Sequence, residues 1–114
     1  MAVGAIGWQT EKRGDVTVIA PSGRIDESTA SEFKDHLRET AILADGTMVI
    51  DLHGIDYMSS RGLRALTLAQ RAGADAGTTI ILARPNDTMR EILAISRYDM
   101  IFKVVDTIED AVTE

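Results

Sequence analysis

Residues 48–68, MVIDLHGIDYMSSRGLRALTL, form the stretch that decides how the rest of the chain folds. The run at residues 48–52 is apolar, with β-branched residues and a single acid, which is typical of a buried strand. From Gly62 onward, apolar residues recur at steps of three and four, which predicts a helix. Ser59 and Ser60 lie between the two patterns, where the first N–H groups of a helix have no partner inside it and can hold a negative charge.

Two strands are predicted at the start of the chain. Residues 5–13 are a weak strand candidate, residues 16–20 are a stronger one, and the turn at residues 12–14 joins them as a hairpin. Pro21 follows the second strand, and proline has no N–H for a sheet ladder. We therefore expect Pro21 at the edge of the sheet or at the end of its strand.

Helices and strands alternate in the remainder of the chain. A helix is expected from about Thr29 to about Leu43, because Thr29 and Glu32 have the spacing of a capping box. The helix after the central strand runs to about Ala74. Beyond it we expect a strand at residues 79–83, a helix opened by residues 85–87, a strand at residues 100–105 and a short helix at residues 107–112. The order β-β-α-β-α-β-α-β-α predicts an α/β fold, in which helices pack against a mixed sheet and residues 1–114 form one domain.

Composition excludes several classes of protein. The chain has no cysteine, so disulfide scaffolds, thiol nucleophiles and thiolate metal sites are excluded. A formal net charge of −6 argues against a nucleic-acid partner, because such binding depends on Lys and Arg neutralising phosphates. No apolar run approaches the ~20 residues that span a bilayer, and a secretory signal is not found. We expect a soluble, cytoplasmic protein that does not bind a membrane. Its partner should be another protein or a small ligand.

Catalytic, cofactor and metal motifs are not found either. His53 lies near Ser60, but the residues leading to Gly62 are not the Gly-x-Ser-x-Gly elbow of a hydrolase. His53 is interpreted as a polar residue at the end of a strand. Gly54 and Gly62 are eight residues apart with no Lys-Ser or Lys-Thr after them, so the phosphate-binding loop pattern fails. The sequence predicts no enzyme, no cofactor and no metal.

The hydroxyls and arginines at the start of the central helix have two interpretations. Serine is a preferred N-cap, which contributes about 1 kcal/mol. The same position also suits a phosphate, which would meet free N–H groups and the positive end of the helix dipole. Arg61 and Arg64 lie at the unfavourable end of that dipole, which favours a phosphate on Ser60 or a partner carboxylate nearby. The alternative is that both side chains simply lie in water.

These residues resemble the STAS domain, in particular the bacterial anti-sigma-factor antagonists. The resemblance covers nearly the whole chain: GRIDESTASEF after the hairpin, VIDLHGIDYMSSRGLRAL in the centre, then TIILA and MREILAISRYDMIFKVVDTIEDAV. It implies the STAS-type mixed sheet and a partner switch. In that family the unmodified antagonist binds a serine kinase of the histidine-kinase-like ATPase type that is also an anti-sigma factor. Phosphorylation by the kinase breaks this complex, and a PP2C-type phosphatase restores it.

The resemblance also implies a phosphorylation site. The family places the phosphorylated hydroxyl two positions before a glycine, so Gly62 assigns it to Ser60, and Ser59 is the alternative acceptor in a place often held by Asp. Arg61 stands where the family has a small residue. Asp26 resembles a second family acid near this site. The partner-binding residues expected around Ser60 are Asp26, Ser28, Tyr57, Met58, Ser59, Arg61, Gly62 and Arg64.

Alternatives remain for these residues and for the function. Tyr57 and Met58 fit burial beneath the loop as well as contact with a partner. STAS domains also occur as accessory subunits of ABC-type lipid transporters and as tails of anion transporters, and some partner switches control secretion and not a sigma factor. A sensor of nucleotides or small ligands, using the region of Asp26 and Ser60, is a third hypothesis.

Overall fold

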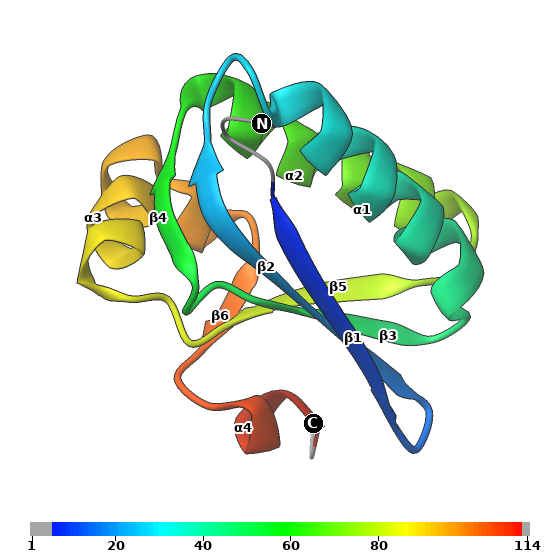
Figure 1. Ribbon diagram of the computed structural model, residues 1–114. Helices are drawn as coiled ribbons and strands as arrows, with labels where there is room; N and C mark the ends of the chain where they lie inside the picture. Colours follow the sequence, from blue (N-terminus) through cyan, green and yellow to red (C-terminus); the bar gives the residue numbers. More distant parts are fainter. Residues whose placement is uncertain (1–5, 113–114) are drawn as a thin grey trace.

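The elements follow the predicted order, with one strand added (Figure 1). The structure is a computed structural model that describes residues 6–112, so Ala5, where the first strand was predicted to begin, lies outside the described residues. Its strands are β1 (Gly7–Arg13), β2 (Val16–Ile25), β3 (Thr47–Asp51), β4 (Ile55–Met58), β5 (Thr79–Ala83) and β6 (Lys103–Val105). Its helices are α1 (Ala30–Ala44), α2 (Ser60–Asp75), α3 (Asp87–Ser96), the short 3-10 helix η1 (Tyr98–Met100) and α4 (Ile108–Val112).

The sheet is mixed, as predicted. Its order is β1-β2-β3-β5-β6, and β4 pairs with β2 beside this path. Strands β1 and β2 are antiparallel, and all the other pairs are parallel. The mixed α/β fold is confirmed, while β4 replaces part of the loop that was expected after β3. This strand has only four residues, and its exposed Asp56 and Tyr57 are adjacent, so it lacks the alternation that signals a strand.

Strand β2 has two parallel neighbours in succession. It pairs with β3 from Val16 to Ile19 and with β4 from Gly23 to Ile25, with a register shift between Gly23 and Arg24. Pro21 lies in the interval between these two pairings, where neither parallel strand requires an N–H from it. The expectation that Pro21 marks the edge of the sheet or the end of its strand is therefore wrong.

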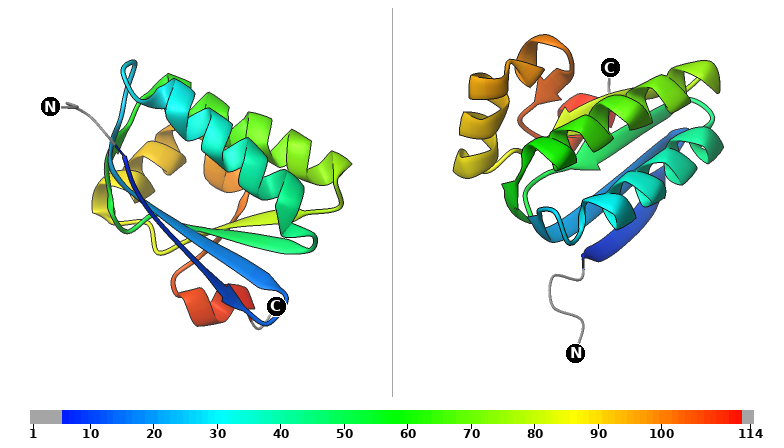
Figure 2. Two further views of the ribbon diagram at one scale, coloured as in Figure 1. Left: turned by 45° about the vertical axis from the view of Figure 1, so that its right-hand side comes forward. Right: turned by 90° about the horizontal axis from the view of Figure 1, so that it is seen from above.

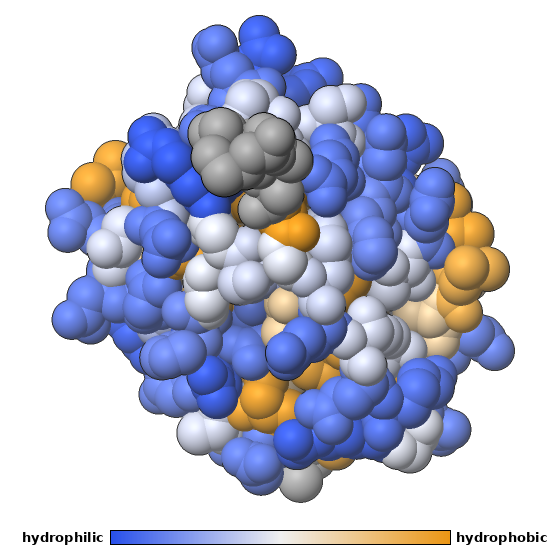
Figure 3. Space-filling view, in the orientation of Figure 1, coloured by the Kyte–Doolittle hydropathy of each residue, from blue (hydrophilic) through white to orange (hydrophobic). Residues whose placement is uncertain are grey.

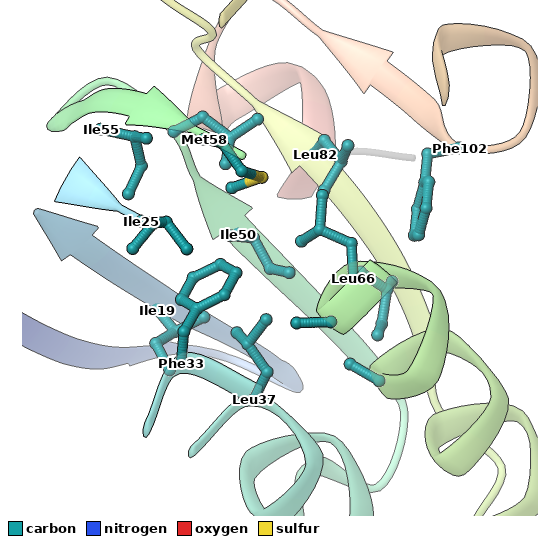
Figure 4. Close-up of a cluster of buried hydrophobic side chains, with 14 of the residues drawn as sticks. Ile19, Ile25, Phe33, Leu37, Ile50, Ile55, Met58, Leu66, Leu82 and Phe102 are labelled. Carbon is teal, nitrogen blue, oxygen red and sulfur yellow. The ribbon is translucent and has the colours of Figure 1, made fainter. Parts of the chain in front are cut away.

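The helices cover the two faces of the sheet unequally. Helices α1 and α2 lie side by side over one face, and the short α4 lies on the other (Figures 1 and 2). Beneath α1, the fully buried Phe33 and Leu37 point toward Ile19 and Ile50 of the sheet (Figure 4). Neighbouring residues of β2, β3 and β5 point the opposite way, as strand geometry requires, and form a smaller cluster with α4: Val18, Val49, Ile81, Ala83, Ile108 and Ala111. The short helix predicted at residues 107–112 is confirmed as α4.

The last strand begins later than predicted. Residues 100–102 were expected in the strand, but the N–H groups of Ile101 and Phe102 both donate to the carbonyl of Tyr98, at 3.0 and 2.9 Å. These bonds keep the chain in a turn that follows α3. Strand β6 therefore begins at Lys103.

Candidate functional site

Two loops leave the sheet beside each other and lead into the two long helices. The α1 loop (residues 26–29) follows β2, and the α2 entry (residues 59–61) follows β4 and includes the first residues of α2. Because β2 and β4 are parallel neighbours, both loops lie at the same edge. The N–H of Ser59 donates to the carbonyl of Ile25 at 2.8 Å, which joins the α2 entry to the end of β2, immediately before the α1 loop. The starts of α1 and α2 consequently lie together, as the view from above shows (Figure 2).

Asp26 closes the α1 loop on itself. One carboxylate oxygen accepts hydrogen bonds from the hydroxyl and the backbone N–H of Ser28, at 2.7 and 2.9 Å. The other oxygen lies 3.1 Å from Nε of Arg24. These contacts, above all those from Ser28, hold the pKa of Asp26 below its ordinary value. The carboxylate is therefore ionised at neutral pH, and most of its bonding capacity is used within the loop.

Thr29 is the N-cap of α1, as predicted, but the capping box does not form. Its hydroxyl donates to the carbonyl of Arg24 at 2.8 Å and accepts from the N–H of Asp26 at 2.9 Å. The Thr29 backbone is near-helical and turns the hydroxyl back into the loop, whereas a capping residue is usually extended. Glu32 accepts a hydrogen bond from the indole of Trp8 at 3.4 Å instead.

The two serines of the α2 entry have different environments. Ser59 is the extended N-cap of α2, and its hydroxyl accepts from the N–H of Gly62 at 3.4 Å. Ser60 is the first residue of the helix and is exposed. Within residues 6–112, no hydrogen bond involves the Ser60 hydroxyl. Capping therefore belongs to Ser59, which leaves the Ser60 hydroxyl accessible.

Arg24 connects the α1 loop to β4, although it is not among the residues predicted from the sequence. It pairs with Asp26 of the α1 loop, and its guanidinium lies 4.4 Å from the centre of the Tyr57 ring on β4. Arg24 and Tyr57 are also register partners in the sheet. The signal available in the sequence was its position two residues before Asp26, since alternate residues of a strand share a face.

Met58 and Gly62 lie under the site and are not part of its surface. Met58 is 2% exposed and points into the core beside Ile25 (Figure 4). Gly62 is also buried, and a Cβ added there would lie 2.5 Å from Cγ of Met58 and 2.7 Å from Cγ2 of Ile25. Since a partner cannot reach either residue, we remove both from the expected partner-binding set. Tyr57, by contrast, is 36% exposed and remains available for contact.

The rest of the expected set lies at the surface. Ser28, Arg61 and Arg64 are exposed, while Asp26 and Ser59 are half-buried. In the described part of the chain, Arg61 and Arg64 form no ion pair, so their charges face solvent near Ser60. Residues 6–112 contain no group of three or more His, Asp or Glu side chains that could hold a metal ion. None of the helices described combines the length and the apolar character needed to cross a bilayer.

The chain belongs to the STAS domain family, whose model matches residues 7–111. A STAS-domain containing protein of Pseudomonas aeruginosa is 31% identical over 91 residues, which are 80% of this chain and 89% of that protein. An anti-sigma factor antagonist from Mycobacterium paratuberculosis is 27% identical, with a TM-score of 0.78 over 98% of this chain and 95% of that one. Bacillus SpoIIAA, solved in its phosphorylated form, shares the fold at 23% identity, with a TM-score of 0.66 over 94% of this chain and 97% of that one. The predicted relationship to anti-sigma-factor antagonists is confirmed.

Proposed function

We propose that this chain is the anti-sigma-factor antagonist of a partner switch. In its unphosphorylated form it binds a serine kinase of the histidine-kinase-like ATPase type that is also an anti-sigma factor. Phosphorylation of Ser60 separates the two proteins, and a PP2C-type phosphatase reverses the modification. The chain is the substrate of the kinase, is not itself an enzyme, and acts in the cytoplasm. The observation that carries this proposal is the exposed Ser60 hydroxyl, without a hydrogen bond in the described chain, at the first position of α2.

The α2 entry is compatible with Ser60 in both its unphosphorylated and its phosphorylated form. The hydroxyl is accessible to a kinase, and its removal costs the fold no hydrogen bond. A phosphate at the same place would lie at the positive end of a 16-residue helix, near N–H groups that have no partner inside it. The exposed guanidinium groups of Arg61 and Arg64 are close in sequence and can pair with phosphate oxygens. The free domain can therefore carry the phosphate without refolding.

The same phosphate would oppose binding. It adds a charge of about −1.5 to −2 and three strong acceptors at a position that had been a neutral hydroxyl. Within a contact between proteins, such a group must lose its water or keep the surfaces apart. A loss of ~4 kcal/mol weakens binding about a thousandfold. Similarity to an anti-sigma factor antagonist, and to a SpoIIAA solved with phosphate attached, supports this mechanism for the chain.

The first experiment identifies the partner and the modified residue. The unphosphorylated protein serves as bait in a pull-down, and the recovered kinase is then incubated with it and ATP. We expect mass spectrometry to find phosphate on Ser60, and Ser60→Ala to abolish it. Ser59→Ala is the matched control and should still be phosphorylated. Phosphate found only on Ser59 would contradict the assignment.

Binding measurements test the switch itself. The phosphorylated protein should bind the recovered kinase about a thousandfold more weakly than the unmodified one. Ser60→Asp should also bind much more weakly, while Ser60→Ala should bind with near wild-type affinity. Recovery of an ABC-type ATPase in place of a kinase would reject the switch and favour a transporter subunit.

A further inference from the structure

The outer groove between α1 and α2 carries most of its charge as unpaired cations. This α1–α2 groove consists of two hollows that both border Leu68. Five cationic side chains line it: Lys34 and Arg38 from α1, and Arg61, Arg64 and Arg71 from α2. The acids that line it are Glu27 and Asp75, which lie at its two ends.

This concentration is unusual for an acidic protein. The chain has 12 Lys and Arg residues and a net charge of −6, yet five of these cations line one groove. Within residues 6–112, none of the five forms an ion pair. The arginines that do form ion pairs all lie elsewhere: Arg13, Arg24, Arg84 and Arg90. Clustered and uncompensated cations are typical of a surface that receives a negatively charged partner.

The floor of the α1–α2 groove is apolar and shallow. Small side chains keep it open: Ala65 lies beside Leu68 in one hollow, and Ala72 lies beside it in the other. At the far end Ile42 is 50% exposed, and the space-filling view shows a hydrophobic area over the C-terminal end of α1, at the right (Figure 3). Two helices side by side form a groove into which a third helix packs.

We propose that the α1–α2 groove binds an acidic amphipathic helix from a partner protein. Its apolar stripe lies on Leu68, Ala72 and Ile42, while its flanking carboxylates pair with the cations on both walls. A second copy of this chain fits poorly, because a symmetric contact would place the same cations against each other. A nucleic acid gains nothing from the apolar floor and is repelled by the net charge. This surface extends beyond the Ser60 switch and shares only Arg61 and Arg64 with it.

The test uses a labelled synthetic peptide of about 18 residues, or five helical turns, with Leu at helical spacing and Glu elsewhere. Fluorescence anisotropy compares it with a peptide in which Lys replaces every Glu. The groove variant is Arg38→Glu with Arg71→Glu. The matched control is Lys12→Glu with Arg97→Glu, which changes the net charge equally at exposed positions outside the groove.

We expect the groove variant to weaken binding of the Glu peptide about tenfold, and the control less than about threefold. Ser60→Ala should bind the peptide like the wild type, which separates this surface from the proposed switch. If circular dichroism shows the groove variant unfolded, Arg38→Gln with Arg71→Gln replaces it, with a weakening of about threefold expected. Equal losses in groove variant and control would overturn the proposal. Equal affinity for the Lys peptide, or tighter binding of a DNA oligonucleotide than of the Glu peptide, would also overturn it.

Discussion

The α1 loop and the α2 entry use similar groups in opposite ways. In the α1 loop, the Asp26 carboxylate and the Thr29 hydroxyl are occupied by hydrogen bonds within the loop. In the α2 entry, one hydroxyl caps the helix, while that of Ser60 has no hydrogen bond in the described chain. A polar group at the start of a helix is therefore available for function when a neighbouring residue already caps the helix. Three sets of substitutions, at Gly62, at the two serines and at Asp26, test how separate these tasks are.

Gly62→Ala should have the largest effect, because it pushes the α2 entry away from the strands beneath it. The new Cβ would lie 2.5 Å from Cγ of Met58 and 2.7 Å from Cγ2 of Ile25, and Ile25 is β-branched and stiff. Such overpacking costs up to about 3 kcal/mol, while alanine regains about 1 kcal/mol of helix propensity. The free energy of unfolding, measured with urea, should therefore fall by about 2 kcal/mol.

Gln70→Ala is the control for this substitution, because it changes a half-buried residue on the same helix. It should alter the free energy of unfolding by no more than about 0.5 kcal/mol. A Gly62→Ala protein as stable as the wild type would mean that the α2 entry can shift freely, and that it is not held by close contact with β2 and β4.

Ser59→Ala and Ser60→Ala should separate the two serines. Loss of the cap at Ser59 should destabilise the protein by about 0.5–1 kcal/mol, at the lower end of the usual range because its hydrogen bond is long. Ser60→Ala should stay within about 0.5 kcal/mol of the wild type. Thermal unfolding followed by circular dichroism measures both. Equal losses for the two variants would show that the serines share the capping task.

Asp26→Asn should produce the smallest change, and one that depends on pH. Asn keeps an oxygen that can accept from Ser28 but loses the charge that faces Arg24. Because the pKa of Asp26 is lower in the folded protein than its ordinary value of 3.8, ionised Asp26 stabilises the fold above that pH. This contribution is lost as the pH falls below 3.8 and through the lower pKa of the folded state.

The wild type should accordingly melt at a slightly higher temperature than Asp26→Asn at pH 7, and this difference should shrink as the pH is lowered through 3.8. Asp56→Asn, at an exposed site on the neighbouring β4, serves as the control and should melt like the wild type at pH 7. A difference that grew on acidification would mean that the carboxylate strains the α1 loop.

Periodicity predicted the regular parts of the fold well. The strand at residues 79–83 was placed at its observed bounds, and the helix predicted from Gly62 begins only two residues earlier in the structure. In α2 the apolar side chains recur at helical spacing, whereas the strand is a short continuous apolar run that is buried. The failures lie where tertiary contacts outweigh local pattern: β4 is too short to show a period, and Pro21 is tolerated because its two parallel neighbours leave an interval.

The sequence predicted where the residues of the candidate site lie along the chain, but not which of their side chains face outward. The sequence located Ser60, Asp26 and the two arginines at the starts of helices, because those positions follow from chain order. Which of Tyr57 and Met58 faces outward depends on the pairing of β4 with β2, which no local pattern reveals. The link from Arg24 to Tyr57 has the same origin, since it joins residues that are distant in sequence and paired in the sheet.

The parallel pairing of β2 with β4 also bears on how a partner would associate. The start of α2 is fastened to the end of β2 by the hydrogen bond between Ser59 and Ile25, and Arg24 of β2 stacks on Tyr57 of β4 just before the two loops. This surface, formed by the ends of β2 and β4 and the loops that follow them, is preorganised. It therefore loses little conformational entropy when a partner binds. Partner binding should then be a rigid-body association. Substitutions on this surface should alter the lifetime of the complex more than the rate of its formation.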